Sequence, residues 1–306
     1  MLLTLAIAID LALGEPARFI HPVVWMGKVM SLLEKGNKGK SPIIQFIYGS
    51  GIVLFNIGLF AVPVYLILLY LKNLNFIAYI VAAAVLLKPT FSLKELRRAA
   101  LKVKRCIVED KLDEARVDLR SLVSRDTAKL PKPLLISAVV ESVAENAGDS
   151  FVAPLFYFLL LGVPGAIAYR VVNTMDAMIG YHGKYEFLGK FASRLDDILN
   201  FVPARLTALL LVLAAFLLRK DGRNALQVAF KEHSRTESPN AGWPIAAVAG
   251  ALNVQLGKVG QYTLGTMTTA LISETIAVAL NLMLVAMIIW VLICLLAGGT
   301  QVVLRA

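Results

Sequence analysis

The chain has 306 residues, of which 58% are hydrophobic and only 17% are charged, and its mean hydropathy is +0.71. This composition excludes an ordinary soluble domain and is typical of an integral membrane protein. The formal net charge of +10 does not by itself indicate nucleic-acid binding, because Lys and Arg in cytoplasmic loops of membrane proteins produce the same excess. The two cysteines, Cys106 and Cys294, lack the spacing of a metal site, a redox pair or a disulfide framework.

Apolar segments recur along the whole chain. Met1 to Ile9 has no basic n-region and no cleavage pattern, so we expect it to stay in the mature protein. Ser41 to Leu71 is uncharged and long enough to span a membrane with a tilt or a kink at Pro63, and a polar turn joins it to the short apolar run from Asn75 to Leu87. Further candidates are 151–169, 201–218 and 276–297. The sequence predicts an all-α, multi-pass protein of the cell membrane, one domain over 1–306, with about four to six membrane-embedded helices.

A basic segment at 90–130 interrupts the apolar runs. Apolar residues recur there at helical spacing on both sides of a break near Glu109 and Asp110. Lys and Arg are dense between Lys88 and Lys132, as in cytoplasmic loops. We therefore expect a cytoplasmic amphipathic helical hairpin whose charges face solvent near anionic lipid.

The positive charges after Leu218 constrain the two middle segments. These charges favour the cytoplasm, as does the basic segment at 90–130. Because the chain then starts and ends on the same side, 151–169 and 201–218 either both span the membrane or both do not. The polar stretch 170–200 lies outside in the first case and inside in the second. Gly162, Pro164 and Pro203 favour re-entrant or broken helices, which need protein or a wet cavity around their backbone. Either arrangement predicts a polar pocket at membrane depth.

Three carboxylates run directly into the 151–169 segment. Glu141, Glu145 and Asp149 follow one another at i, i+4 and i+8, so a continuous helix would place them on one face. Carboxylates so arranged repel one another unless a cation joins them, and Mg²⁺ takes one or two carboxylates together with substrate phosphates. The pattern predicts a Mg²⁺ site, and the alternative is a solvated helix end.

Two groups of donors and acceptors lie beside apolar runs. "YRVVNTMDAMIGY" contains Arg170, Asn173, Thr174 and Asp176, and "SRLDDILNFVPAR" contains Arg194, Asp196, Asp197, Asn200 and Arg205. Arg is the preferred residue for bidentate binding of carboxylate or phosphate. For Arg170 the alternative is an arginine that extends along the helix end to the membrane interface.

Two Pro-rich segments complete the candidates. In "DLALGEPARFIHPVVWMGK", His21 is either a proton carrier or a loop contact between two prolines. "SPNAGWPIAAVAGAL" offers Asn240 and Trp243 before a run of small residues suited to close helix packing. The sequence contains no standard nucleotide-binding or zinc-binding motif.

Six blocks of the chain, taken together, resemble a known family. In chain order they are "DLALGEPARFIHPVVWMGK", "SRDTAKL", "ESVAENAGDSFVAPLFY", "PGAIAYRVVNTMDAMIGY", "RLDDILNFVPARLTALL" and "SPNAGWPIAAVAGAL". They are similar to the signature blocks of the adenosylcobinamide-phosphate synthase family, membrane enzymes of cobalamin biosynthesis. The blocks extend from Asp10 to about Leu252, and six in sequence are highly specific.

This resemblance implies an enzyme that uses ATP and Mg²⁺ to join adenosylcobyric acid, through a propionate side chain, to aminopropanol or aminopropanol phosphate. The implied partners are these substrates, the lipid bilayer and other late enzymes of the pathway, without nucleic acid. The candidate catalytic residues are Asp126, Glu141, Glu145, Asp149, Asp176 and His21, with Glu141, Glu145 and Asp149 as metal ligands. The candidate substrate-binding residues are Arg125, Asn146, Arg170, Asn173, Thr174, Arg194, Asp196, Asp197, Arg205, Asn240 and Trp243. A non-catalytic transporter or sensor of the same fold is the alternative.

Overall fold

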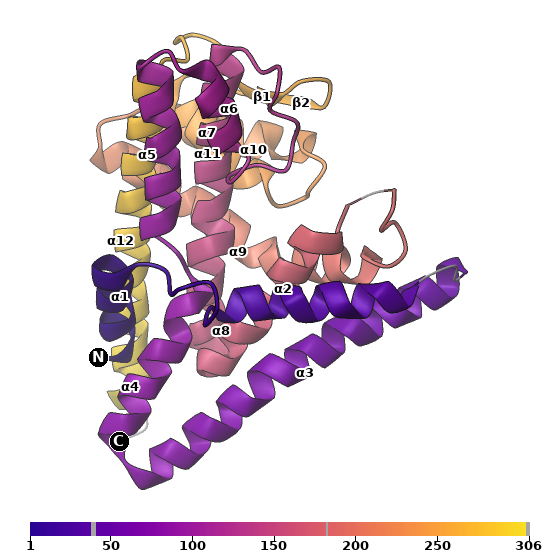
Figure 1. Ribbon diagram of the computed structural model, residues 1–306. Helices are drawn as coiled ribbons and strands as arrows, with labels where there is room; N and C mark the ends of the chain where they lie inside the picture. Colours follow the sequence, from indigo (N-terminus) through magenta and orange to yellow (C-terminus); the bar gives the residue numbers. More distant parts are fainter. Residues whose placement is uncertain (38–40, 182, 304–306) are drawn as a thin grey trace. The chain divides into compact units, whose positions relative to one another are not determined.

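The computed structural model describes residues 1–37, 41–181 and 183–303 (Figure 1). The described chain is almost entirely helical, and five of its helices are long and apolar enough to cross a membrane: Pro42–Leu74, Phe76–Val108, Lys132–Ile179, Lys190–Leu217 and Ser273–Ala297. The prediction of an all-α, multi-pass membrane protein is confirmed. The chain divides into two compact units, one made of Met1–Ser92 and Ala153–Asn200, the other of Leu93–Val152 and Phe201–Ala306.

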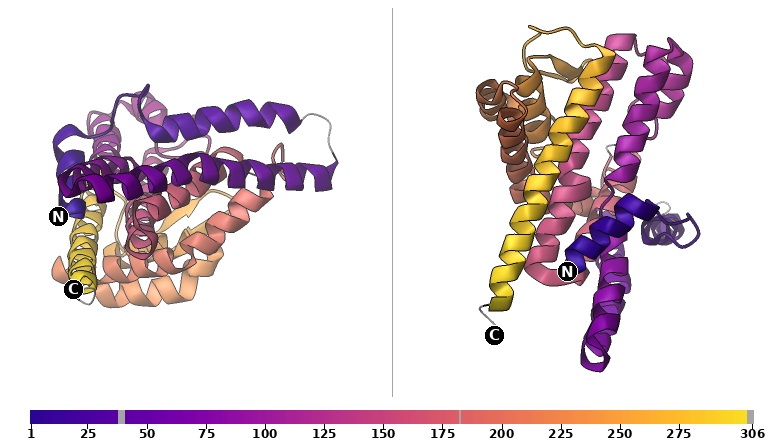
Figure 2. Two further views of the ribbon diagram at one scale, coloured as in Figure 1. Left: turned by 90° about the horizontal axis from the view of Figure 1, so that it is seen from below. Right: turned by 90° about the vertical axis from the view of Figure 1, so that its left-hand side faces the viewer.

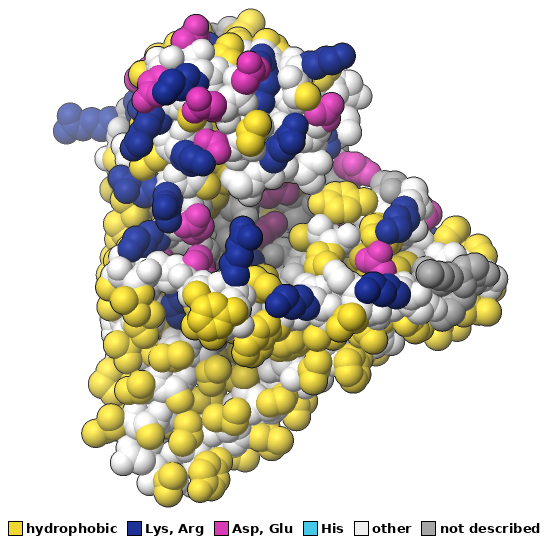
Figure 3. Space-filling model, viewed as in Figure 1, with side chains coloured by type: hydrophobic (Ala, Val, Ile, Leu, Met, Phe, Trp, Pro, Cys, Tyr) yellow, Lys and Arg dark blue, Asp and Glu magenta, His cyan; other side chains and the backbone are white. Residues whose placement is uncertain are grey.

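The first unit is built around long apolar helices. It contains α1 (Leu2–Leu13), α2 (Pro22–Leu33), α3 (Pro42–Leu74), α4 (Phe76–Leu87), α8 (Ala153–Ile179), the start of α9 (Lys190–Leu217), and the 3₁₀ helices η1 (Glu34–Asn37) and η2 (Lys88–Thr90). Asn75 ends α3 and caps α4, because its side chain accepts the backbone N–H of Ala78. The resulting α3–α4 hairpin is the one predicted. Its surface is mostly hydrophobic in Figure 3, as lipid contact requires, and Figure 2 shows α2 beside α3.

Helix α8 is broken at Gly162. This residue has φ 70° and ψ −164°, a conformation that side-chain-bearing residues rarely adopt. Tyr157 and Tyr169 lie on opposite sides of the break, and their rings stack with centroids 5.3 Å apart. Their Cα atoms would be about 18 Å apart along a straight helix. The chain therefore reverses direction at Gly162, and 151–169 is a broken helical segment, the form that Gly162 and Pro164 favoured.

The second unit carries the amphipathic hairpin. Helices α5 (Lys94–Val108) and α6 (Leu112–Leu119) pack on each other, and the break between them includes Asp110 in a left-handed conformation at φ 57°. Their apolar stripe, including Ala100 and Ala115, is buried, whereas Lys, Arg, Asp and Glu cover the exposed face (Figure 3). The hairpin is present as predicted, and its cytoplasmic location stays a prediction, as does the single domain.

The rest of the second unit packs around α7 (Lys132–Ala147). It consists of the π-helix η3 (Gly148–Val152), the end of α9, α10 (Gly222–Glu232), the 3₁₀ helix η4 (His233–Arg235), α11 (Gly242–Leu252), β1 (Leu256–Lys258), β2 (Tyr262–Leu264) and α12 (Ser273–Val303). α12 and α7 lie side by side in Figure 2. β1 and β2 form a short antiparallel hairpin, with Leu256 opposite Leu264. This hairpin, which the sequence analysis did not predict, packs through β1 on α7.

Candidate functional site

The carboxylate of Glu141 on α7 is held by three donors within the second unit. Its Oε2 atom accepts hydrogen bonds from Arg125 Nη2 and Tyr262 Oη, each at 2.7 Å, and its Oε1 atom accepts one from Ser137 Oγ at 2.7 Å. Ser137 Oγ also accepts the backbone N–H of Gly257 in β1, at 3.0 Å. These residues, the Glu141 cluster, tie the loop before α7 and the β1–β2 hairpin to one buried carboxylate.

Electrostatics keep the two titratable partners of Glu141, Arg125 and Tyr262, in the form that binds it. Burial raises the pKa of Tyr262, and the nearby charge of Glu141 raises it further, so the phenol remains a hydrogen-bond donor. Burial alone would lower the pKa of Arg125, but the charge of Glu141 and its hydrogen bond raise it, so the guanidinium stays charged. The result is a buried ion pair with an additional neutral donor.

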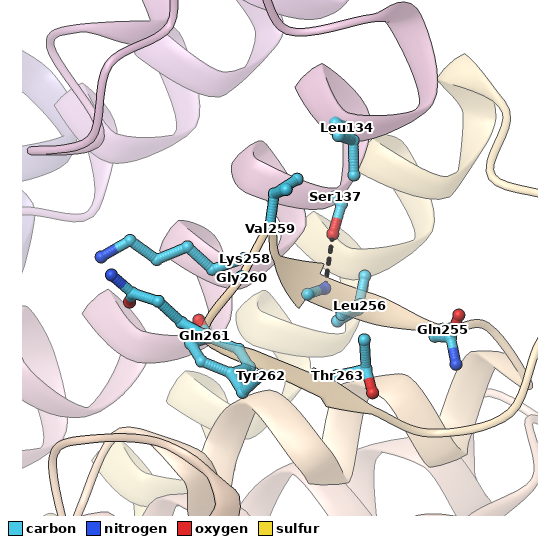
Figure 4. A pocket seen from close by; sticks show the side chains of 11 residues that line it. Leu134, Ser137, Gln255, Leu256, Lys258, Val259, Gly260, Gln261, Tyr262 and Thr263 are labelled. Carbon is cyan, nitrogen blue, oxygen red and sulfur yellow. Dashed lines mark hydrogen bonds between the residues drawn. The ribbon is translucent and has the colours of Figure 1, made fainter.

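A cavity of about 340 Å³ adjoins this cluster (Figure 4). It lies between Leu134 and Ser137 of α7 and the β1–β2 hairpin, and the side chains of Lys258 and Gln261 extend together at the hairpin turn in Figure 4. The dashed line in Figure 4 is the Gly257–Ser137 hydrogen bond, which fixes the hairpin at the inner side of the cavity. The cavity therefore has a polar wall at Ser137 and a cationic side chain, that of Lys258, at its edge.

The expected three-carboxylate metal site does not fit this geometry. α7 ends at Ala147, and a π-helix carries the next residues, so Asp149 does not continue the α-helical spacing of Glu141 and Glu145. Arg125 already neutralises Glu141. Among the described residues, no group of three or more His, Cys, Asp or Glu side chains is placed to hold a metal ion. A cationic side chain thus already contacts the Glu141 carboxylate, and binding of Mg²⁺ by Glu141, Glu145 and Asp149 together with substrate phosphates stays a prediction.

In the first unit, the structure joins the two predicted groups around Asp196 of α9. Asp196 Oδ1 accepts from Asn173 Nδ2 at 3.3 Å, and its Oδ2 atom accepts from Asn200 Nδ2 at 2.9 Å. Asn173 Oδ1 in turn accepts from Arg170 Nη1 at 3.1 Å, and Asn200 Oδ1 accepts from Tyr169 Oη at 2.9 Å. We call these five residues the Asp196 cluster. It brings a guanidinium and a carboxylate onto one network between α8 and α9.

A second network in the first unit surrounds Glu15. Its Oε2 atom lies 2.9 Å from Lys88 Nζ and 2.8 Å from His21 Nε2, and Lys88 Nζ also lies 3.2 Å from Asp10 Oδ1. The Lys88 and Asp10 side chains are only 3% and 1% exposed. We call these four residues the Glu15 cluster. It joins the end of α1, the start of α2 and the turn after α4 through buried charges.

The tautomer of His21 follows from its partners. His21 is the N-cap of α2, and its Nδ1 atom accepts the backbone N–H of Val23 at 3.2 Å. The proton of the neutral ring is therefore on Nε2, which donates to Glu15. Burial alone would raise the pKa of Glu15, but hydrogen bonds from His21 and Lys88 outweigh it and lower this pKa to about 2. Both ring nitrogens are engaged, a geometry suited to positioning Glu15, and a proton-carrying role of His21 stays a prediction.

The last cluster lies in the second unit and joins α9 to the start of α11. Arg205 Nη1 donates to Asn240 Oδ1 at 3.3 Å, and the guanidinium carbon lies 3.6 Å from the Phe201 ring centroid and 5.0 Å from that of Trp243. The His233 ring also stacks on Trp243, with ring centroids 3.9 Å apart. The structure thus gathers Arg205, Asn240 and Trp243, three predicted substrate-binding residues, into one Arg205 cluster.

The remaining predicted residues lie near these clusters or outside them. The Asp126 side chain accepts the N–H of Ala128 in an exposed loop, and Arg194 is 74% exposed beside Asp197. Thr174 Oγ1 donates to the carbonyl of Arg170 within α8, and Asn146 Nδ2 donates to that of Ser142 within α7. Glu145 lies on α7, Asp149 on η3 and Asp176 on α8, all half-buried. Their catalytic and binding roles stay predictions.

Sequence reasoning missed several residues that hold these clusters together. Lys88, Ser137 and Tyr262 are the main ones. Lys88 could have been noticed because it stands before a proline directly after an apolar run, where burying a charge costs free energy. Nothing local marked Tyr262, because it reaches Glu141 from 121 residues away in sequence.

The fold and these clusters define the class: an all-α, multi-pass membrane protein with buried ion pairs and arginine-containing polar clusters. The family described as CobD/CbiB protein matches residues 3–283. The chain is 52% identical over 297 residues to cobalamin biosynthesis protein CobD of Dehalococcoides mccartyi, covering 96% of this chain and 95% of that protein. It is 41% identical over 305 residues to the probable cobalamin biosynthesis protein CobD of Methanothermobacter thermautotrophicus, covering 99% and 98%.

The chain therefore belongs to the CobD/CbiB family, which is the adenosylcobinamide-phosphate synthase family, and the resemblance seen in the sequence is confirmed. No solved structure matches the chain.

Proposed function

We propose that this protein acts in cobalamin biosynthesis as an ATP-dependent amide ligase. The carboxylate of adenosylcobyric acid and the ammonium group of aminopropanol or aminopropanol phosphate are joined. A carbon–nitrogen bond forms, one carboxylate oxygen leaves on a phosphoryl group of ATP, in released phosphate or in the nucleoside monophosphate, and the ammonium group loses two protons to a base and to solvent. The single observation that carries the proposal is the 52% identity to a cobalamin biosynthesis protein over 96% of the chain.

Two clusters suit the anionic groups of this reaction. Arg170 of the Asp196 cluster and Arg205 of the Arg205 cluster each give one donor to an amide oxygen. The planar guanidinium group has a geometry that matches carboxylate and phosphate. We assign carboxylate or phosphate binding to these two arginines.

ATP and Mg²⁺ are proposed as cosubstrate and cofactor from the family. When bound, Mg²⁺ would neutralise phosphate charge during activation of the carboxylate. The Glu141 cluster does not fit as a preformed metal site, so we assign it a positioning role for the β1–β2 hairpin. No step of the reaction is assigned to Glu141 itself.

The test is an assay of the purified, detergent-solubilised protein. Adenosylcobyric acid and MgATP are supplied with either aminopropanol or aminopropanol phosphate, and the corrinoid amide and the nucleotide product are measured. We expect amide product that depends on ATP and on Mg²⁺. The control variant is Arg97→Lys on the exposed face of α5, which should leave the rate unchanged. Specific substrate binding without any amide product would favour the non-catalytic transporter or sensor.

A further inference from the structure

A sharp turn joins the apolar end of α9 to α10. α9 is long and apolar enough to cross a membrane, and its last residues include the exposed side chains of Phe216 and Leu217. Arg219 adopts a left-handed conformation at φ 52°, and the N–H of Lys220 donates to the Ala215 carbonyl at 2.8 Å, so the helix ends here. α10 therefore begins where a segment suited to lipid contact ends.

The inner face of α10 is fixed by α11, on which it packs (Figure 1). Ala225, Val228 and Ala229 are buried there. Gly250 of α11 comes so close that a Cβ added to it would lie 2.7 Å from the Ala225 Cα atom. The Asn224 side chain donates to the Gly250 carbonyl at 3.1 Å. Because this face is closely packed and its polar group is paired, the opposite face of α10 stays at the surface.

The outer face of α10 places large apolar side chains among cations. Leu226 and Phe230 are 38% and 60% exposed and stand one helical turn apart, on one side of the helix. Four cations are exposed on this face or in the turn before it: Arg219, Lys220, Arg223 and Lys231. We call these six residues the α10 surface. Exposed apolar residues beside Lys and Arg are typical of helices that lie in a membrane interface.

The α10 surface carries a positive charge. Asp221 is the N-cap of α10, where its side chain accepts the N–H of Asn224 at 2.9 Å. Glu232 pairs with Arg235 at 2.9 Å. These two carboxylates are the acidic residues between 219 and 232, so the four cations exceed them. The surface therefore complements an anionic partner.

The mixture of side chains on the α10 surface decides which anionic partner fits. Arg223 and Lys231 are costly to place in the hydrocarbon core, whereas Leu226 and Phe230 gain free energy by leaving water. The headgroup region satisfies both, because long cationic side chains reach headgroups while apolar ones reach the acyl chains. The cytoplasmic leaflet contains anionic lipid, which attracts Lys and Arg. α10 follows α9 directly, which keeps it within reach of that region.

We infer that α10 lies in the plane of the membrane surface and binds anionic phospholipid, with Leu226 and Phe230 toward the acyl chains and the four cations on the headgroups. The α10 surface lies outside the clusters assigned to the proposed function, so the test does not depend on ligation. An acidic protein segment or a second copy of the chain would use the same charges or apolar side chains, and both are outcomes of the test.

The test uses an environment-sensitive dye attached at Gln227→Cys, an exposed position beside Leu226. The two native cysteines are buried, and the protein without the substitution gives their background labelling. The purified, detergent-solubilised protein is titrated separately with phosphatidylglycerol, phosphatidylcholine and an acidic peptide, and the dye emission gives each dissociation constant. The molecular mass of the labelled protein is measured at the end of each titration.

Three variants carry the same dye. Arg223→Gln/Lys231→Gln removes two cations of the α10 surface, and Leu226→Gln removes an apolar side chain. Arg97→Gln/Arg98→Gln removes two exposed cations from α5 and is the matched control. Thermal unfolding checks that each variant is folded. In nanodiscs containing phosphatidylglycerol, quenching of the dye by nitroxide-labelled lipid and by aqueous iodide measures the depth of α10 without any change to the α10 surface.

We expect phosphatidylglycerol to bind at least tenfold more tightly than phosphatidylcholine, and nitroxide-labelled lipid to quench the dye more than iodide does. Arg223→Gln/Lys231→Gln should raise the dissociation constant for phosphatidylglycerol at least tenfold, and Leu226→Gln about threefold. The α5 control should change it less than about twofold. The inference is overturned if the two lipids bind equally, if folded Arg223→Gln/Lys231→Gln binds like wild type, if the acidic peptide binds more tightly than phosphatidylglycerol, or if a doubled mass accompanies the response of the dye.

Discussion

Arg125 and Glu141 form a buried ion pair: Nη2 of the arginine lies 2.7 Å from Oε2 of the glutamate, and their side chains are 15% and 2% exposed. The pair joins the loop after α6 to the middle of α7. Tyr262 donates to the same glutamate oxygen, so the β1–β2 hairpin depends on this pair as well. A glutamate that the sequence suggested as a metal ligand is thus the anchor of a loop and a hairpin.

Removing one member of this pair should be more damaging than removing both. Glu141→Gln leaves Arg125 charged and poorly compensated, and we expect a loss of about 3–5 kcal/mol in the free energy of unfolding. The double variant Arg125→Met/Glu141→Gln leaves no unpaired charge and should cost less than Glu141→Gln alone. Thermal unfolding in detergent gives the stability of wild type, Glu141→Gln, Arg125→Met and the double variant. Additive losses would contradict the assignment, and the exposed Arg98–Glu95 pair is the control, expected to contribute less than about 1 kcal/mol.

The Glu15 cluster predicts a specific loss of stability in acid. The folded-state pKa of Glu15, about 2, lies below its usual value of 4.5. The carboxylate therefore contributes stability that is complete above about pH 4.5 and is lost as the pH falls toward 2, and solvent screening limits it to the order of 2 kcal/mol. Wild type should exceed Glu15→Gln in unfolding temperature at pH 6, and the difference should shrink by pH 3.

The control for this pH dependence is Glu95→Gln, a change at an exposed glutamate of α5. It should shift the unfolding temperature little at either pH. A difference between wild type and Glu15→Gln that stays constant from pH 6 to pH 3 would show that Glu15 does not act through its charge.

The reversal of α8 makes Gly162 sensitive to a single added methyl group. Among the described residues, an added Cβ would meet Pro164 Cδ alone, at 3.7 Å, so the cost of Gly162→Ala comes from the positive φ of 70°. We expect a loss of about 1–2 kcal/mol in the free energy of unfolding. The matched control is Gly58→Ala within α3, where an added Cβ meets open space and should be neutral or stabilising. Equal effects of the two changes would mean that the reversal at Gly162 is absent.

How much of this fold was predictable differs between elements. The α5–α6 hairpin followed from a local periodicity of apolar residues, and the break in α8 from Gly162 beside Pro164, because both depend on residues close in sequence. The β1–β2 hairpin was missed because its strands have three residues each, too short for an alternating pattern. The sequence did contain one sign of its turn, the glycine at position 260, which adopts a positive φ of 73° in the structure.

The sequence offered candidate residues but did not show which of them contact one another. Arg170 and Asp196 were predicted separately, and the structure places them in one network through Asn173. The partners of Glu141 come from a loop and a hairpin distant in sequence, and such pairing is set by tertiary packing rather than by spacing. The pattern of three carboxylates suggested Mg²⁺, which stays a prediction, and it did not indicate that an arginine contacts Glu141.

Arg170 should not be replaceable by lysine. Its Nη1 donates to Asn173, and we assign its planar guanidinium to an anionic group of substrate or nucleotide. Lysine keeps the charge but cannot make two parallel hydrogen bonds, so we expect Arg170→Lys to lower the rate of amide formation at least tenfold, and Arg170→Ala more. Rates are compared at matched protein levels with Arg97→Lys as control. A lysine variant as active as wild type would mean that Arg170 only extends to the membrane interface.

The central claim, that this protein forms an amide by ATP-dependent activation of a carboxylate, is tested most directly by isotope transfer. Adenosylcobyric acid labelled with ¹⁸O in its carboxylate is incubated with purified protein, MgATP and aminopropanol phosphate, and the products are measured by mass spectrometry. The account predicts that the amount of corrinoid amide equals the amount of ATP consumed. For each amide formed, one ¹⁸O atom should be transferred to the released phosphate or to the nucleoside monophosphate. Amide without transfer of ¹⁸O, or ATP consumption without amide, would contradict it.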